Sequence, residues 1–445
     1  MPPNIIYMHS HDTGRYISPY GHAARTPNLQ RFAEQATLFR HAFTVNPTCS
    51  PSRAALVTGM YPHCNGMLGL AHRGFALHDY NQHIVNTLKP HGYHTALAGI
   101  QHVARPDASV IGYDRVLCDK GDADVVSRAA ADFLHEAARD RPDEPFFLSV
   151  GFFETHRPFP EPAPADDPRH TNPPAPLPDM PEVRRDMAGY NTMAHELDDG
   201  MGRVLAALDA AGLGENTFVI ITTDHGIAFP HMKCNLTDHG IGVMLMIRGP
   251  RDSAFNTGRV IEPMVTHLDL FPTICDVVGI DHPDWLQGES LLPLVRGEVG
   301  TLHEAVFAEV NFHAAYEPKR AVRTERYKYI RRFDGRTRPV RPNCDDGYSK
   351  RLLLQHCWSD DPLVEEYLFD LVFDPNETNN LVARPEMATV LEEMRDRLDR
   401  WMRDTNDPLL DGPLMIPAGA RLNPPDGQEP GNAEAELVEV ARRAP

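Results

Sequence analysis

Long apolar runs are missing from this chain of 445 residues. None approaches the ~18 to 20 consecutive apolar residues that a membrane-spanning helix requires, so the sequence argues against a transmembrane protein. The first residues, MPPNIIYMHSHD, enter a strand-like segment at once and lack the charged, apolar and small-residue regions of a signal peptide. We therefore expect no membrane association and a cytoplasmic location.

Cysteine pairs and an excess of positive charge are also absent. The seven cysteines form no CxxC pair, which argues against a disulfide framework or a zinc ribbon. Lys and Arg number 43 against 62 Asp and Glu, giving a formal net charge of −19. This charge opposes extended contact with nucleic acid, whose phosphates are neutralised by basic residues. An anionic substrate would need positive charge gathered locally.

Short β-rich runs alternate with helical patterns over the first three hundred residues. This alternation is typical of an α/β fold in which helices cover both faces of a large, mostly parallel sheet. The candidate strands are residues 4–8, 95–100, 146–153, 217–223, 243–247 and 305–310. Apolar residues at helical spacing predict a helix from Tyr190 to Leu208, which Gly212 and Gly214 end.

Composition then divides the chain into three parts. The length fits one large domain and a smaller one, since single cores stop growing near ~250 to 300 residues. We expect a large α/β domain over residues 1–315 and a C-terminal α+β subdomain over 316–410, built on an antiparallel sheet with a helix at 386–403. Residues 411–445 are rich in Pro, Gly and Glu, which indicates an extended tail that could embrace a neighbouring subunit in a homo-oligomer.

Residues 158–181 contain ten prolines, so no regular element can persist there. This segment follows the strand predicted at 146–153 and must be a long surface loop. It is either a rim over a site at the end of that strand or a simple connection.

Several candidate strands end in residues that bind metals or transfer protons. The carboxyl ends of parallel strands lie at one edge of an open sheet, where ligands bind. A lone histidine there is more often structural, but several together favour one site because unpaired buried imidazoles and carboxylates are costly. Asp12, Asp224 and His225, with His11 as a further ligand, are consistent with one divalent cation. The remaining strand-end residues of this kind are His9, His102 and His156.

The segment VNPTCSPSRAALVTG, residues 45–59, places Cys49 at the start of an expected helix. Ser50 is a good N-cap and Pro51 a good first helical residue. The helix N-terminus would favour an anion and lower the pKa of the thiol, and Arg53 offers a planar fork of donors to sulfate or phosphate. Taken alone, a single cysteine in such a turn is better interpreted as a buried structural thiol.

The segment CSPSRAALVTG also resembles the C-x-P-S-R…T-G signature of type I sulfatases of the alkaline phosphatase superfamily. In that family the cysteine is oxidised to formylglycine by a formylglycine-generating enzyme. The resemblance covers most of the chain and is strongest to the N-sulfoglucosamine sulfohydrolase (sulfamidase) branch. It rests on NGMLGL, FFLSVGFFETHRP, TTDHGIAFP, HLDLFPTI and LFDLVFDPNETNNL. It implies a sulfatase-like fold and the hydrolysis of a sulfate ester or sulfamate, with a sulfated sugar or other organosulfate as the small anionic substrate.

The resemblance also implies a role for each matching residue. Cys49 would become hydrated formylglycine, the nucleophile, and Arg53 would hold it. His156 would donate a proton to the leaving group, while Lys233 and His102 would contact the sulfate oxygens. One divalent metal ion would be bound by His11, Asp12, the modified Cys49, Asp224 and His225.

Two departures from the family pattern leave alternatives open. Sulfatases usually present Asp-Asp and Asp-Asn pairs suited to calcium, but here the pairs are His11-Asp12 and Asp224-His225, so manganese or zinc becomes an alternative to calcium. An Asp-His pair also resembles phosphonate monoester and phosphodiester hydrolases of the superfamily.

The second departure is Ile100, in GIQH, which stands where the family has a sulfate-binding lysine. Arg73 or Arg105 would have to compensate for it as a substrate-binding cation. A non-catalytic protein that binds anionic sugars is the remaining hypothesis.

Overall fold

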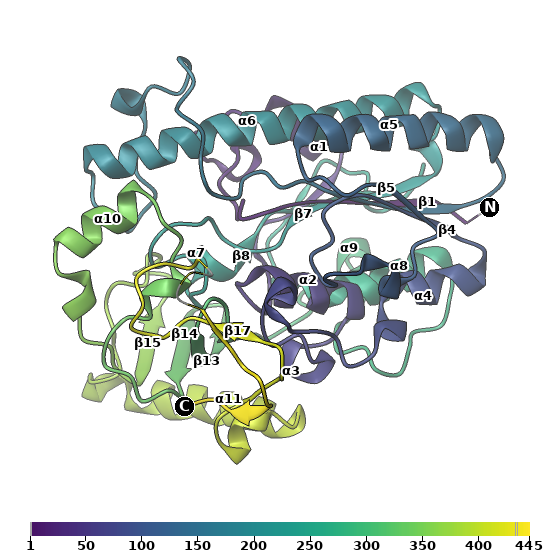
Figure 1. The fold of residues 1–445 in the computed structure, drawn as a ribbon. Helices are drawn as coiled ribbons and strands as arrows, with labels where there is room; N and C mark the ends of the chain where they lie inside the picture. Colours follow the sequence, from purple (N-terminus) through teal and green to yellow (C-terminus); the bar gives the residue numbers. More distant parts are fainter. Residues whose placement is uncertain (1, 432, 434) are drawn as a thin grey trace.

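A sheet of eight strands organises the first part of the chain in the computed structural model, which describes residues 2–431, 433 and 435–445 (Figure 1). The strand order is β10-β2-β9-β7-β1-β6-β4-β5. All neighbours pair in parallel except β9, which runs antiparallel to β2 and β7. The strands are β1 (Asn4–Ser10), β2 (Thr37–Phe39), β4 (His94–Gly99), β5 (Arg115–Cys118), β6 (Phe146–Gly151), β7 (Thr217–Thr223), β9 (Leu245–Arg248) and β10 (Val260–Ile261).

The apolar side chains of β1 alternate between two cores, as expected where a sheet is covered on both faces. Ile5 and Tyr7 pack into one hydrophobic cluster, and Ile6 and Met8 into the other. The first cluster is covered by α2 (Cys49–Thr58), α4 (Ile84–Leu88), α8 (Leu270–Val278) and α9 (Leu292–Arg296). The second is covered by α1 (Pro27–Ala33), α5 (Ala123–Asp140) and α6 (Pro181–Ala210), which lie together above the sheet in Figure 1.

A second, antiparallel sheet follows, in the order β12-β13-β14-β15. Its strands are β12 (Ala305–Phe312), β13 (Tyr316–Thr324), β14 (Tyr327–Arg332) and β15 (Glu366–Asp370), accompanied by α10 (Tyr348–Gln355) and α11 (Ala388–Asp404). The smaller elements are β3 (Ala42–Phe43), β8 (Gly242–Val243), β11 (Val265–Thr266), α3 (Pro62–Asn65) and α7 (Asp238–Ile241). The predicted fold class, a large mostly parallel sheet between helices plus a smaller antiparallel sheet, is confirmed.

One predicted strand belongs to a different sheet from the one expected. Residues 305–310 fall in β12, which pairs antiparallel with β13 and not with the large sheet. Val306, Ala308 and Val310 are buried against the first part of the chain, and Glu309 is fully buried on the other face. A strand buried on both faces has no alternation that distinguishes it from a strand of a parallel sheet. The boundary expected after residue 315 falls in the turn between β12 and β13.

Two further bounds differ from the sequence prediction. The strand expected at 243–247 is divided between β8 and β9, which belong to different sheets. The helix expected from Tyr190 begins at Pro181, because proline fits the first turn of a helix, where its missing N–H costs no hydrogen bond.

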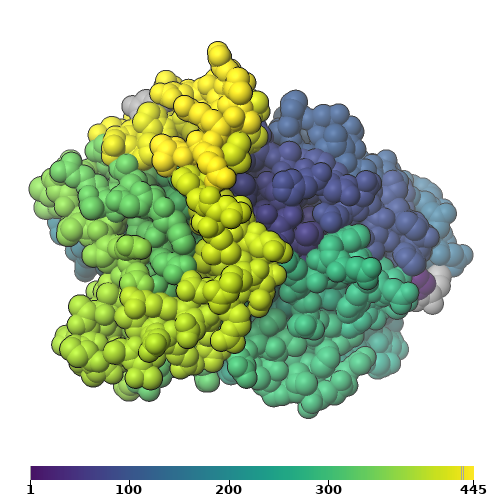
Figure 2. All heavy atoms as spheres, turned by 90° about the horizontal axis from the view of Figure 1, so that it is seen from below, coloured from purple at the N-terminus to yellow at the C-terminus, as the bar shows by residue number. Residues whose placement is uncertain are grey.

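The proline-rich loop and the tail both pack on the rest of the chain. Residues 158–180 contain one short helical turn, Pro168–His170, and no strand. In the tail, β16 (Met415–Ile416) pairs with β19 (Arg442–Arg443), and β17 (Arg421–Leu422) pairs with β18 (Glu436–Leu437). Figure 2 shows this last part of the chain crossing the surface between the second domain and the N-terminal part. Among the described residues, no helix combines the length and apolarity needed to cross a membrane.

Candidate active site

The site begins where the two central strands end. β1 and β7 pair in parallel with Ser10 opposite Thr223, so the residues that follow them face each other. The backbone N–H of Asp12 donates to Asp224 Oδ1 at 2.8 Å. Both carboxylates are buried, with 0% and 3% of Asp12 and Asp224 exposed. The predicted convergence of these two strand ends is confirmed.

Arg53, in the second turn of α2, is aimed at the same carboxylate. Its guanidinium donates to Asp224 Oδ2 at 3.0 Å and to the Ser10 carbonyl at 2.8 Å, and it also contacts the His9 ring. Burial alone would raise the pKa of Asp224, but the neighbouring His225 and Arg53 hold that pKa well below its usual range. Asp224 is therefore ionised at neutral pH.

The histidines that follow Ser10 and Asp224 present ring nitrogens to the carboxylates. His225 Nε2 lies 3.3 Å from Asp12 Oδ1, while its Nδ1 lies 3.0 Å from the Gly226 carbonyl. A carbonyl only accepts, so the Nδ1–H of His225 donates to it, and Nε2 is the ring nitrogen that faces the Asp12 carboxylate. His11 Nδ1 lies 3.2 Å from Asp224 Oδ2, and burial together with the charge of Arg53 lowers the pKa of His11 to about 3.

Buried ring nitrogens and carboxylate oxygens that lack hydrogen-bond partners suit a bound cation. Buried His11 Nε2 and Asp12 Oδ1 have no hydrogen-bond partner. One ligand atom each from His11, Asp12, Cys49 and Asp224 all lie within 4.8 Å of one another. This set of nitrogen, oxygen and sulfur atoms fits a divalent metal ion, and its imidazole and carboxylates are compatible with manganese or zinc as well as calcium.

Cys49 stands at the start of α2 with 2% of its surface exposed, and its Sγ lies 3.4 Å from His225 Nε2. Two expectations about this segment are wrong. The helix begins at Cys49 with Thr48 as its N-cap, while the hydroxyl of Ser50, inside the helix, accepts from the Ala71 N–H at 3.0 Å. The pKa of the thiol is not lowered, because burial raises it well above its usual value.

Lys233 joins the two domains at this site. Its ammonium donates to Asp12 Oδ2 at 2.8 Å and pairs with Asp345 Oδ2 at 2.9 Å. Burial opposes its charge, but Asp12 and Asp345 raise the pKa of Lys233 well above its usual value. Lys233 is therefore a permanent cation beside Cys49, whose thiol pKa it lowers in opposition to burial.

The sequence prediction missed Asp345 and His313, both of which come from the second domain. Asp345 lies between β14 and α10, and His313 in the turn between β12 and β13. Burial alone would raise the pKa of Asp345, but Lys233, His156 and His313 lower it. Neither residue follows a strand of the large sheet, so the rule that found the strand-end residues could not find them.

His102 and His156 lie beside His11. The His11 ring centroid is 5.7 Å from that of His102 and 5.6 Å from that of His156. His156 Nδ1 lies 2.5 Å from the Arg157 carbonyl, so this nitrogen carries a proton. His102 Nε2 lies 2.9 Å from Nδ1 of His72, a residue that the sequence prediction did not single out.

The two arginines considered as substitutes for the missing lysine differ in their surroundings. Arg73 donates to Asn423 Oδ1 at 2.8 Å and to the carbonyls of Ala314, Arg421 and Pro430. These contacts bind the tail and do not support the contact with an anion that we expected of Arg73. Arg105 is exposed. The Ile100 side chain packs beside Gly121 and brings no charge to the site.

Comparison with known proteins shows similarity to sulfatases along most of the chain. A family model described as sulfatase matches residues 3–280, and one described as N-sulphoglucosamine sulphohydrolase, C-terminal, matches residues 231–338. The human N-sulphoglucosamine sulphohydrolase is 31% identical, over 93% of this chain and 92% of its own length.

Two solved structures share the fold. One, in complex with its substrate D-glucosamine-2-N,6-O-disulfate, aligns with a TM-score of 0.68 at 20% identity, covering 92% of this chain and 99% of that chain. A phosphonate monoester hydrolase of Agrobacterium radiobacter aligns with a TM-score of 0.67 at 21% identity, covering 91% of this chain and 96% of that chain.

Proposed function

Because the chain belongs to the sulfatase family, and is thereby a sulfuric ester hydrolase, we propose that it hydrolyses the sulfate ester or sulfamate of a small organosulfate around Cys49. The observation that carries this proposal is the position of Cys49. Its Sγ lies within 4.8 Å of ligand atoms of Asp12 and Asp224, and 3.4 Å from His225 Nε2. No other described cysteine belongs to such a group.

One divalent cation would be held by His11, Asp12, Asp224 and His225, together with the side chain at position 49. The unpartnered His11 Nε2 and Asp12 Oδ1 support this assignment. When bound, the cation would supply Lewis acidity to the sulfate group and to the nucleophile. Manganese, calcium and zinc remain alternatives, because the ligand set mixes imidazole with carboxylate.

The nucleophile would be formylglycine made from Cys49 by a formylglycine-generating enzyme. A thiol whose pKa is raised by burial is almost wholly protonated at neutral pH and is a poor nucleophile itself. Hydrated formylglycine would supply one hydroxyl to attack sulfur and a second to expel sulfate and restore the aldehyde.

The remaining side chains would then position the anion and move one proton. Lys233 and His102 would contact the sulfate oxygens, and the fixed positive charge of Lys233 would stabilise the charge that develops during transfer. His156 would act through Nε2, as the imidazolium, to protonate the departing alcohol or amine, because its Nδ1–H already donates to the Arg157 carbonyl. Arg53 would keep Asp224 ionised and in place.

A cavity beside the site suggests where the rest of the substrate lies. It has a volume of about 520 Å³ and is lined by the proline-rich loop, α6, α10 and the tail. Arg157 and Asp346, which line it, directly follow His156 and Asp345 in the chain. Arg351 on its wall is exposed and stacks 4.7 Å from the Tyr348 ring centroid, where it could meet an anionic group. With the similarity to an N-sulphoglucosamine sulphohydrolase, this favours a sulfated or N-sulfated sugar.

Mass spectrometry of the Cys49 peptide tests the proposal, using protein made with and without a formylglycine-generating enzyme. We expect the mass of formylglycine only in the first sample, and hydrolysis of an aryl sulfate only by that sample. Cys49→Ala should abolish turnover, whereas Cys275→Ala, at a fully buried thiol in α8, should retain it. Equal turnover by unmodified protein would contradict the mechanism.

A phosphodiester or phosphonate monoester hydrolase is the second candidate. His225 favours it, because an imidazole beside the metal departs from the sulfatase pattern, and the phosphonate monoester hydrolase shares the fold. Rates with an aryl sulfate and an aryl phosphodiester, each with added calcium or manganese, separate the two. A phosphodiester rate higher by orders of magnitude would replace the sulfatase assignment. Turnover that Cys49→Ala abolishes would eliminate a non-catalytic binding protein.

A further inference from the structure

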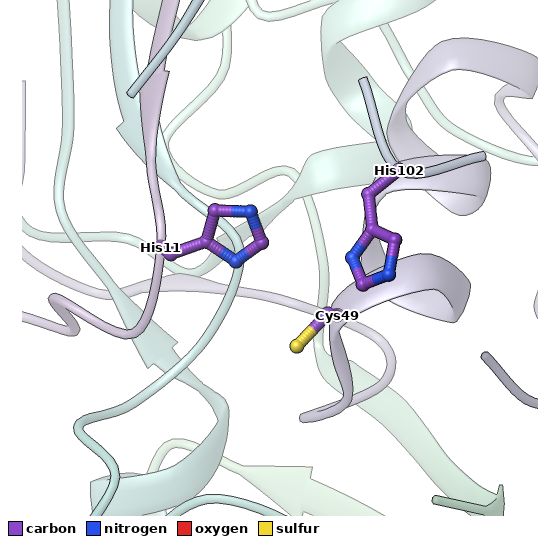
Figure 3. A group of neighbouring side chains, drawn as sticks. All are labelled: His11, Cys49 and His102. Atoms are coloured by element: carbon purple, nitrogen blue, oxygen red, sulfur yellow. The ribbon is translucent and has the colours of Figure 1, made fainter. Parts of the chain in front are cut away.

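Three side chains at the site form a ligand set of their own. One ligand atom each from His11, Cys49 and His102 lie within 4.8 Å of one another. Figure 3 shows the two imidazole rings facing each other across a gap, with the Cys49 side chain at the edge of the same space. The three residues come from the end of β1, the start of α2 and the segment after β4.

The nitrogens that face this gap have no other partner. His11 is 2% exposed and its Nε2 has no hydrogen-bond partner, while its Nδ1 lies 3.2 Å from Asp224 Oδ2. His102 Nδ1 is buried and unpartnered, while its Nε2 is held by His72 Nδ1 at 2.9 Å. His102, held through one nitrogen while the other is free, has the arrangement usual for a metal ligand.

The chemistry of the three atoms selects the kind of ion. Two imidazole nitrogens and one thiolate suit zinc or cobalt and are poor ligands for calcium, which prefers oxygen. Zn–S bonds of about 2.3 Å and Zn–N bonds of about 2.0–2.1 Å in a tetrahedron place ligand atoms roughly 3.5 Å apart. Side-chain movements of about 1 Å would therefore close the set around an ion.

We propose that the protein with Cys49 as a free thiol binds one zinc-class ion through His11 Nε2, His102 Nδ1 and Cys49 Sγ. The thiol releases its proton to solvent as the metal–sulfur bond forms, and the fourth position stays open to water or an anion. Because His11 also belongs to the oxygen-rich set with Asp12 and Asp224, one ion is bound at a time. Replacing sulfur by oxygen at position 49 removes the soft ligand and transfers preference to that second set.

Cobalt is a direct probe of the sulfur ligand. Protein made without a formylglycine-generating enzyme, verified by mass and stripped with a chelator, is titrated anaerobically with Co²⁺. We expect one equivalent to give a thiolate-to-cobalt charge-transfer absorption, which Zn²⁺ then abolishes by displacement. A folded wild-type protein that gives no such absorption would overturn the proposal.

Variants identify the three ligands. Cys49→Ser should abolish the absorption, and Cys275→Ser, at the buried thiol of α8, should retain it. His102→Gln should weaken cobalt binding at least tenfold, and His72→Phe, which keeps the ring but not its nitrogen, should weaken it ~10- to 100-fold. Circular dichroism checks that each variant is folded.

Unchanged affinity in folded His102→Gln would mean that Cys49 binds the ion with the carboxylates, which overturns the ligand set proposed. This test involves no turnover. Its failure would leave the proposed hydrolase intact, and failure of hydrolysis would leave the metal site intact.

Discussion

Arg53 is the counter-charge of the buried Asp224 carboxylate. Its guanidinium donates to Asp224 Oδ2, and 2% or less of either side chain is exposed. Without Arg53, the ionised Asp224 would lose its counter-charge. The carboxylate would still be buried, held by the Asp12 N–H at 2.8 Å.

We expect Arg53→Leu to lower the free energy of unfolding by about 3–5 kcal/mol, because one partner of a buried ion pair is left alone. Urea denaturation measures this loss. Arg326→Leu is the matched control, since Arg326 pairs with Asp370 but has 51% of its side chain exposed. That substitution should cost about 0–1 kcal/mol. Equal losses would contradict the prediction.

His63 is a second buried cation, at the interface with the second domain. Burial opposes its charge, but the contact with Glu309 outweighs burial and raises the pKa of His63 from 6.5 to about 10. A base whose pKa rises on folding contributes stability that is fully present below its unfolded pKa and is lost as pH rises through its folded pKa.

The stability difference between wild type and His63→Gln should therefore be constant below pH 6.5 and shrink as pH rises toward 10. Urea denaturation at stepped pH measures it. His282→Gln, at a histidine whose side chain is 43% exposed, is the comparison variant near the surface. A His63→Gln difference that is level from pH 6.5 to 10 would refute the assignment.

At the scale of elements, the proline-rich loop and α10 form two walls of the cavity beside the site. Among the described cations that line the cavity, Arg351 of α10 has no ion-pair partner, whereas Arg185 of α6 pairs with Glu161 at 2.8 Å and Lys350 with Asp346 at 2.7 Å.

Arg351→Ala should raise KM about tenfold for a sugar that carries a second sulfate, since a hydrogen bond to a charged group contributes about 1.5 kcal/mol. The kcat for that sugar, and both constants for an aryl sulfate, should stay unchanged. Arg403→Ala, on the exposed surface of α11, should alter neither substrate. A KM increase for the aryl sulfate as well would place Arg351 at the reacting group.

The sequence could predict the residues at the ends of paired parallel strands, and little else of the site. The ends of β1 and β7 located Asp12 and Asp224 because paired parallel strands share an edge. Residues 305–310 were placed in the wrong sheet because a strand buried on both faces shows no alternation. Asp345 and His313 reach the site through the docking of a second domain, for which no local pattern exists. The N-cap of α2 was predicted at Ser50, two residues after the observed N-cap Thr48, which is within the usual uncertainty of helix ends.

At the scale of the molecule, Arg73 fixes the tail across both domains. Its donors meet Asn423 Oδ1, the Ala314 carbonyl of the second domain and the Arg421 carbonyl of the tail. The sequence analysis suggested that the tail could embrace a neighbouring subunit. In the structure the tail contacts its own chain (Figure 2).

Arg73→Ala should destabilise the fold by about 1.5–3 kcal/mol and make residues 412–445 an early site of proteolysis, because several charge-assisted hydrogen bonds are lost. Limited proteolysis and urea denaturation measure both effects. Arg421→Ala, whose exposed side chain lies in the same tail, is the control. An increase in KM for aryl sulfate without increased cleavage would return Arg73 to the anion site.

The burial of Cys49 has a consequence for the order of events during synthesis. Asp345, which completes the surroundings of Lys233 next to it, emerges from the ribosome roughly 300 residues later, or about 15–60 seconds at 5–20 residues per second. Before the second domain has been made, the segment around Cys49 is accessible to another protein. In the folded chain only 2% of the residue is exposed. For the conversion of Cys49 proposed above, the supply of active protein in a cell should therefore depend on how fast a formylglycine-generating enzyme acts relative to translation, more than on how much chain is made.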